Sequence, residues 1–377
     1  MELLFIVAYL VLFVAAMPIQ ISEEGLHTLL KRQRAPPSLP GNDPWYAPPD
    51  NLAAAAPGDI LKWRPAPRPL STDNTRAINV QAMYQIQYRT QNSVGAPIAN
   101  VLTAIVPHNT RTDALFSYIY FSDVPNPNCN PSLSMTLETN VPADWVKQQM
   151  GPIIAALSEG WIVAVPDDGG PQASFPSGPN MAYNTLDSMR AMLRSQEITG
   201  MTPDATITLN GYSGGGIAAA WTGELHPLYA PELKIDGIAL GGLIPDFVFL
   251  SGMLRLSMSV RLLLTFTDLI RSGQGMFRWG PVAFVGLAHD YPELATWLDQ
   301  NLVPETAAEF YNVENLCIEA SSQFYGARNT CNYFTRGCAA WDDEIPARIL
   351  REATTMGLQA TPTAPWYLYA VCLAPDG

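Results

Sequence analysis

The chain has 377 residues, of which 48% are hydrophobic and 15% are charged. This composition excludes a generally disordered protein, and the length allows one large α/β domain with an insertion, or two domains. The formal net charge of −13 argues against a nucleic-acid partner, because binding phosphates requires basic patches.

The N-terminus has the pattern of a secretory leader. We interpret residues 1–20 as a signal peptide, since an apolar run reaches Ala16 and is short for a membrane span. The run departs from the usual leader pattern in having no Lys or Arg before it, and a single membrane anchor is the alternative. Residues 21–32 end in the dibasic pair Lys31-Arg32 and are interpreted as a short pro-segment. We therefore expect a secreted, extracellular protein.

Residues 33–69 are rich in proline and alanine. This composition favours an extended arm on the surface rather than helix or sheet. Trp45, Tyr46 and Trp63 are expected to hold the arm in place by burying aromatic surface.

Strand and helix patterns alternate in the following segment. Short β-branched or aromatic runs bounded by turn residues predict strands at residues 80–89, 100–107, 115–121, 161–165 and 205–210. Apolar residues three and four apart predict helices at residues 144–159 and 179–195. This alternation predicts the α/β class, with a mainly parallel, doubly wound sheet.

The predicted core is interrupted by an insertion. Its first part comprises residues 70–245, and its second part comprises residues 346–377. Residues 246–345 have a mostly helical pattern and begin with a very apolar run that contains Arg255 and Arg261, which disfavour a membrane span. The segment is expected to be a cap or lid, or else buried core helix.

Residues 205–221, ATITLNGYSGGGIAAAW, contain a GxSxG motif between a predicted strand and a predicted helix. In this context the motif is typical of a nucleophile elbow, in which Gly211 and Gly215 avoid clashes around the strained Ser213. Tyr212 precedes the serine, and the N–H of Gly214 at the helix start is placed to receive an oxyanion. The alternative is a glycine-rich turn without chemistry.

Five cysteines in a secreted chain predict disulfides and one remaining thiol. Cys331 and Cys338 are near enough in sequence to close a small loop, which would leave Cys129 and Cys317 to pair and Cys372 free. Composition alone leaves this connectivity open. No metal-ligand spacing, GxGxxG motif or Walker lysine is present, so we expect no metal and no cofactor.

Several segments together resemble the fungal secretory lipase family. They are the elbow and residues 117–132, 159–178, 228–242 and 285–294. The resemblance implies an α/β-hydrolase core, a helical cap after the sixth strand, a Ser–Asp–His triad and hydrolysis of triacylglycerols and related esters.

The resemblance also implies roles for individual residues. Ser213 matches the nucleophile, and Asp123 and Gly214 match the residues whose backbone N–H groups form the oxyanion hole. Asp376 matches the triad acid, and Cys129 and Cys317 match a disulfide. Spacing alone would favour ordinary turn aspartates at positions 123 and 376.

The catalytic histidine is not evident. In α/β-hydrolases it follows the acid, yet this sequence ends at Gly377, directly after Asp376. The histidines present are His27 in the pro-segment, His108 in a polar turn, His226 far along the helix after Ser213, and His289 in the cap. We therefore expect a chain truncated at its C-terminus that lacks its catalytic base.

The leading hypothesis is a secreted serine carboxylester hydrolase of the triacylglycerol lipase type, acting on lipid or ester substrates at a lipid–water interface. One alternative is a catalytically inactive truncated homologue that binds lipid or a partner. Another is an esterase or acyltransferase that acts on a smaller ester.

Overall fold

The computed structural model describes residues 40–139, 141, 143–245, 279–326 and 328–369. The predicted signal peptide and pro-segment, the apolar start of the predicted cap, Cys372 and Asp376 lie outside the described residues.

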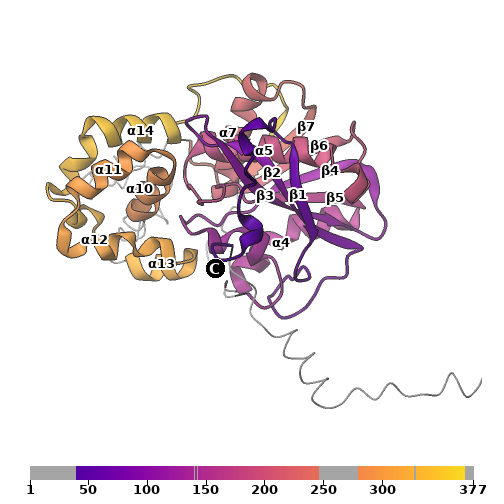
Figure 1. The fold of residues 1–377 in the computed structure, drawn as a ribbon, viewed down its shortest axis with the longest axis horizontal. Coiled ribbons are helices and arrows are strands. Elements are labelled where there is room, and N and C mark those ends of the chain that lie inside the picture. The colour runs from indigo at the N-terminus through magenta and orange to yellow at the C-terminus, as the bar shows by residue number, and fades with distance from the viewer. Residues whose placement is uncertain (1–39, 140, 142, 246–278, 327, 370–377) are drawn as a thin grey trace, which may run out of the picture. The chain divides into compact units, whose positions relative to one another are not determined.

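An eight-stranded mixed sheet forms the centre of the described chain (Figure 1). Its strands are β1 (Ile60–Pro65), β2 (Ala82–Gln91), β3 (Pro97–Val106), β4 (Arg111–Ile119), β5 (Trp161–Pro166), β6 (Thr206–Tyr212), β7 (Ile235–Gly241) and β8 (Trp366–Tyr369). The spatial order is β1-β2-β3-β5-β4-β6-β7-β8. The first three pairings are antiparallel and the other four are parallel. The predicted α/β class with a mostly parallel sheet is confirmed.

Helices cover both faces of the sheet. Helix α4 (Ala143–Ser158) packs on one face, and α5 (Gly178–Leu193) and α7 (Gly214–Tyr229) pack together on the other. Strand β5 shows the alternation: Ile162 and Ala164 contribute to the α5–α7 core, and Val163 and Val165 contribute to the α4 core. A strand buried on both faces therefore has a continuous apolar sequence. Shorter helices are η1 (Pro44–Tyr46), η2 (Leu52–Ala54), η3 (Pro127–Cys129), α3 (Pro131–Ser134) and α6 (Gln196–Thr199).

A group of helices lies between β7 and β8 in the chain. They are α10 (Trp279–Asp290), α11 (Pro292–Asn301), α12 (Pro304–Tyr311), η5 (Asn312–Asn315), α13 (Ile318–Tyr325), η6 (Thr330–Tyr333), η7 (Gly337–Asp342) and α14 (Glu344–Thr354). Figure 1 shows α10 to α14 gathered at one side of the sheet. Phe284 of α10 contacts the rings of Trp297, Phe334 and Trp341, so aromatic packing holds the group together. The cap boundaries at residues 246 and 345 stay predictions.

The predicted arm requires a correction. Residues 60–65 form strand β1, which pairs antiparallel with β2 at the sheet edge, where a terminal proline is tolerated. Trp63 is 48% exposed and so does not bury its ring as expected. Arg64 lies 4.1 Å from the Trp45 ring centroid and forms a 2.8 Å ion pair with Asp43, so a cation contributes to holding the arm.

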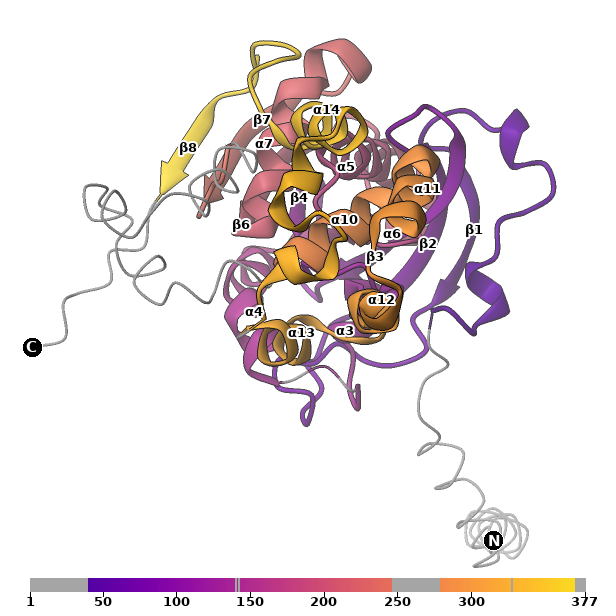
Figure 2. The ribbon, with the colours of Figure 1, turned by 90° about the vertical axis from the view of Figure 1, so that its left-hand side faces the viewer.

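The other end of the described sheet is strand β8, seen at the edge in Figure 2. Its sequence is apolar, yet Tyr367 and Leu368 are 68% and 62% exposed. Of the strands described, it therefore buries its side chains least.

Candidate functional site

The GxSxG segment forms a tight turn between β6 and α7. Ser213 is the residue between them and has φ 55° and ψ −122°, a conformation that is strained for any residue with a side chain. A Cβ at Gly211 would lie 2.1 Å from the carbonyl oxygen of Gly215, and a Cβ at Gly215 would lie 2.2 Å from that of Ile119. Glycine is therefore required at both positions by neighbouring backbone.

Gly214 is in close contact with Asp123, which follows β4. A Cβ at Gly214 would lie 1.7 Å from Oδ1 of Asp123, so the carboxyl group rests against the glycine Cα. Asp123 is buried and has φ 51°, a second strained position next to Ser213. The structure thus brings together Ser213, Gly214 and Asp123, three of the residues for which the family resemblance implies a role.

Two further aspartates follow β5 at the same sheet edge, and the sequence reasoning did not identify them. Burial raises the pKa of Asp167 to about 7, although Ser132 donates hydrogen bonds to it through N–H and Oγ at 2.9 and 2.6 Å. Burial, together with the carboxylates of Asp123 and Asp167, raises the pKa of Asp168 well above its ordinary range. The sequence pattern could have indicated these two aspartates, since Asp-Asp-Gly-Gly directly follows an apolar strand.

Aromatic rings surround the residue before the nucleophile. The Tyr212 ring lies 6.4 Å from that of Phe121 and 6.1 Å from that of Tyr369, measured between centroids. Trp145 of α4 meets Phe121 edge to face at 5.7 Å. An aromatic cluster therefore surrounds the residue that precedes Ser213.

Each described histidine has a hydrogen-bond partner other than Ser213. In His289, Nδ1 lies 2.7 Å from the carbonyl oxygen of Gln172, and Nε2 lies 2.9 Å from Oε1 of Glu314. His226 is buried, with Nε2 at 2.8 Å from the Leu233 carbonyl oxygen. His108 is exposed, as expected, and bonds Asn79.

Two disulfides are present among the described cysteines. Cys129 pairs with Cys317 across 188 residues, and Cys331 pairs with Cys338 across 7. The first is the pairing that the resemblance implies, and it ties the loop after β4 to the start of α13. The second closes the small loop that the spacing allows.

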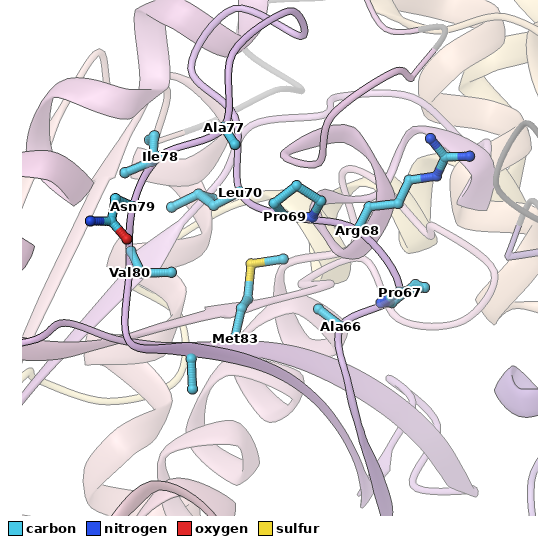
Figure 3. A pocket seen from close by; sticks show the side chains of 11 residues that line it. Ala66, Pro67, Arg68, Pro69, Leu70, Ala77, Ile78, Asn79, Val80 and Met83 are labelled. Atoms are coloured by element: carbon cyan, nitrogen blue, oxygen red, sulfur yellow. The ribbon is translucent and has the colours of Figure 1, made fainter. Parts of the chain in front are cut away.

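A surface hollow of about 490 Å³ lies away from these residues (Figure 3). It is lined by residues 66–70, 77–80, 82 and 83, with Leu70, Ile78, Val80 and Met83 among the side chains around it. None of its lining residues is one of the predicted site residues, so the hollow does not enlarge the candidate site.

Two other kinds of feature are absent from the part of the chain that the structure describes. There, no group of three or more His, Cys, Asp or Glu is arranged to hold a metal ion. Nor does any helix within that part have both the length and the hydropathy needed to cross a bilayer.

Comparisons with known proteins place this geometry in a family. Residues 136–252 match the model of the secretory lipase family. The chain is 33% identical over 305 residues to "Lipase A" of Arthroderma benhamiae, covering 80% of this chain and 61% of that protein. It is 30% identical over 346 residues to a "Probable trichothecene esterase" of Stachybotrys chartarum, covering 88% of this chain and 66% of that protein.

A solved structure shows the same fold. Candida antarctica lipase A in its closed state superposes with a TM-score of 0.74 at 24% identity, covering 89% of this chain and 74% of that chain. The chain thus spans about three fifths to two thirds of the length of the two curated relatives. The matched segment and the curated relatives show that the chain belongs to the secretory lipase family.

Proposed function

We propose that the protein is a secreted serine carboxylester hydrolase of the triacylglycerol lipase type, with Ser213 as its nucleophile. The observation that carries this proposal is the strained Ser213 at the junction of β6 and α7, enclosed by Gly211, Gly214 and Gly215. The apolar leader sequence, the two disulfides and the family membership support secretion.

In the proposed reaction, the Oγ of Ser213 attacks the ester carbonyl carbon and its proton passes to a base. The backbone N–H groups of Gly214 and Asp123 then donate hydrogen bonds to the oxyanion. Collapse of this intermediate releases the alcohol, and water hydrolyses the acyl-serine in a second, equivalent cycle. Asp376 is proposed as the triad acid that orients the base.

We further propose that none of the three described histidines is that base. Both ring nitrogens of His289 already face acceptors, and His226 is held at Leu233. Without a positioned base a serine hydroxyl is a weak nucleophile, and loss of a triad member costs up to about a millionfold in turnover.

Labelling with a fluorophosphonate probe tests the proposed nucleophile. We expect labelling of the wild-type chain, complete loss of labelling in Ser213→Ala, and an unchanged rate in His289→Ala. Mass spectrometry of the labelled peptide identifies the modified residue. Labelling that survives Ser213→Ala would refute the proposed nucleophile, and labelling abolished by His289→Ala would instead identify His289 as the base.

An esterase that acts on a smaller ester is the second candidate, because one relative is described as a probable trichothecene esterase. Hydrolysis of an emulsified triacylglycerol and of a soluble short-chain ester by the same preparation separates the two candidates. The lipase proposal requires the emulsion to be hydrolysed in a Ser213-dependent manner. Ser213-dependent hydrolysis of the soluble ester alone would favour the second candidate.

A further inference from the structure

The chain segment that leads from β4 to Asp123 leaves the sheet before it reaches the proposed site. The last paired residue of β4 is Ile119, which lies opposite Gly211 of β6. Phe121 comes after this pair and is buried, so its backbone N–H and C=O each need a hydrogen-bond partner. Asp123 follows Phe121 by two residues, a distance of at most about 7 Å along the chain. The position of the Asp123 backbone therefore depends on how Phe121 is held.

Gln149 of α4 supplies both partners of the Phe121 backbone. Its Oε1 accepts a hydrogen bond from the Phe121 N–H at 2.6 Å, and its Nε2 donates one to the Phe121 carbonyl oxygen at 3.1 Å. A neighbouring antiparallel strand would offer the same pair of hydrogen bonds. Among the described residues, both bonds of the Phe121 backbone go to this one side chain rather than to another strand. Gln149 thus fixes the segment where the sheet no longer does.

Gln149 is a polar residue on an otherwise apolar helix face. Val146, Met150 and Ile153 of α4 belong to the apolar core that includes Val163 of β5. Gln149 itself is 0% exposed. Burying an amide costs free energy unless its polar groups are hydrogen-bonded, and the two bonds to Phe121 meet this need. The contact with Phe121 therefore accounts for a glutamine at this buried position.

Helix α4 also contacts the ring of Phe121. Trp145, four residues before Gln149 and therefore on the same side of the helix, meets this ring edge to face at 5.7 Å. The ring of Tyr212, the residue before Ser213, lies 6.4 Å from it. Because α4 holds both the backbone and the ring, Phe121 connects this helix to the turn that carries the proposed nucleophile.

We propose that Gln149 is a positioning residue for the oxyanion hole, which acts by holding the Phe121 backbone and so sets where the N–H of Asp123 lies relative to Gly214. The inference rests on the proposed function, in which the Asp123 N–H is one of two oxyanion donors. Catalytic groups act fully only within about 0.5 Å of the productive geometry. Loss of the Gln149 hydrogen bonds should therefore slow the reaction of Ser213 even though Gln149 touches no substrate.

Gln149→Met removes both hydrogen bonds and keeps a side chain of similar length. When a fluorophosphonate reacts with Ser213, its phosphoryl oxygen occupies the oxyanion hole. We expect Gln149→Met to lower the second-order rate constant of labelling by at least about tenfold. Ile153→Ala is the matched control, because it opens a cavity on the same helix face and removes no hydrogen bond of Phe121, so its rate should equal that of the wild type. Equal rates in Gln149→Met and the wild type would overturn the proposal.

Gln149→Glu separates the hydrogen bonds from packing through pH. A protonated carboxyl group accepts from the Phe121 N–H and donates to its C=O as the amide does, whereas a carboxylate only accepts. A buried carboxyl group keeps its proton to higher pH than an exposed one. The labelling rate of Gln149→Glu, divided by that of the wild type, should therefore be near one at about pH 5 and fall towards pH 10. A ratio that stays constant would contradict the role of the hydrogen bonds, and this variant decides if Gln149→Met does not fold.

Hydrogen exchange followed by NMR tests the position of the segment without relying on Ser213. The Phe121 N–H should exchange at least about tenfold faster in Gln149→Met than in the wild type, and it should stay protected in Ile153→Ala. An unchanged exchange rate of this N–H in Gln149→Met would overturn the proposal. If the wild type is not labelled by the fluorophosphonate, the proposed function fails, while the exchange rates still decide whether Gln149 holds the segment.

Discussion

Ser213 adopts a backbone conformation that its neighbours impose on it. A non-glycine residue at φ 55° costs roughly 1–3 kcal/mol. The Ser213 N–H donates to the carbonyl oxygen of Gly241 at 2.9 Å, and its own carbonyl oxygen accepts from the N–H of Ile217 at 3.0 Å. These two hydrogen bonds attach the turn to β7 and to α7. The sheet and the helix together therefore keep Ser213 in its strained backbone conformation.

Replacing Gly214 by alanine tests how tightly this turn is packed. The new methyl group would overlap the Asp123 carboxyl, so Asp123 must move away from the proposed oxyanion hole. We expect Gly214→Ala to lower the rate of Ser213 labelling by roughly a hundredfold, since small displacements of catalytic groups have effects of this size. Gly237→Ala is the matched control, because a Cβ there meets nothing within 4 Å. Equal rates in the two variants would contradict the proposed contact.

At the scale of elements, helix α10 is joined to the core by polar and by close-packed contacts. Oδ2 of Asp290, its last residue, accepts hydrogen bonds from the N–H and Oγ of Ser93 at 3.3 and 2.6 Å and from Oγ of Ser177 at 3.1 Å. Its Oδ1 accepts one from Asn180 of α5 at 2.8 Å. Nearby, a Cβ at Gly286 would lie 1.8 Å from the Phe175 carbonyl oxygen, so α10 approaches the core backbone directly.

Asp290→Ala should therefore weaken the junction between α10 and the core. The change leaves buried donors of Ser177 and Asn180 without their acceptor, which costs roughly 2–4 kcal/mol in the free energy of unfolding. Urea denaturation measures this loss. Glu293→Ala removes a carboxyl group that is half exposed and paired with Arg348 at the surface, and should cost less than about 1 kcal/mol. Equal losses would show that the Asp290 network adds no stability.

At the scale of the whole molecule, the long-range disulfide and the buried acids act on global stability. Cys129–Cys317 joins the loop after β4 to the start of α13 across 188 residues, and closing so long a loop restricts the unfolded chain strongly. Asp167 instead lowers the free energy of unfolding at neutral pH. Its carboxyl group is buried, and its pKa is raised to about 7.

The pH dependence of unfolding tests the contribution of Asp167. A carboxyl group whose pKa is raised on folding favours the folded state below its unfolded pKa of about 4, and this contribution is lost as pH rises through 7. The free energy of unfolding of the wild type, minus that of Asp167→Asn, should therefore decrease by a few kcal/mol between about pH 4.5 and pH 8. Urea denaturation at both pH values measures it, and a constant difference would rule out a raised pKa.

Much of the core could be predicted from sequence because its signals are local. All five predicted strands overlap observed strands, and helices 144–159 and 179–195 correspond to α4 and α5. The GxSxG turn was predictable for the same reason, since glycine spacing and the flanking strand and helix lie within one short segment. Strand β1 was missed because its proline-rich composition suggested an arm, whereas its pairing with β2 decides its conformation.

The sequence by itself thus determined the α/β class, the elbow at Ser213 and the family. Only the tertiary structure placed the carboxyl of Asp123 against Gly214 and brought Asp168 to the same edge. The physical reason is the strand order: β4 lies between β5 and β6 in the sheet, whereas β5 lies between β4 and β6 in the chain. Local patterns predict strands and turns, whereas contacts between the residues that follow different strands depend on which strands pair.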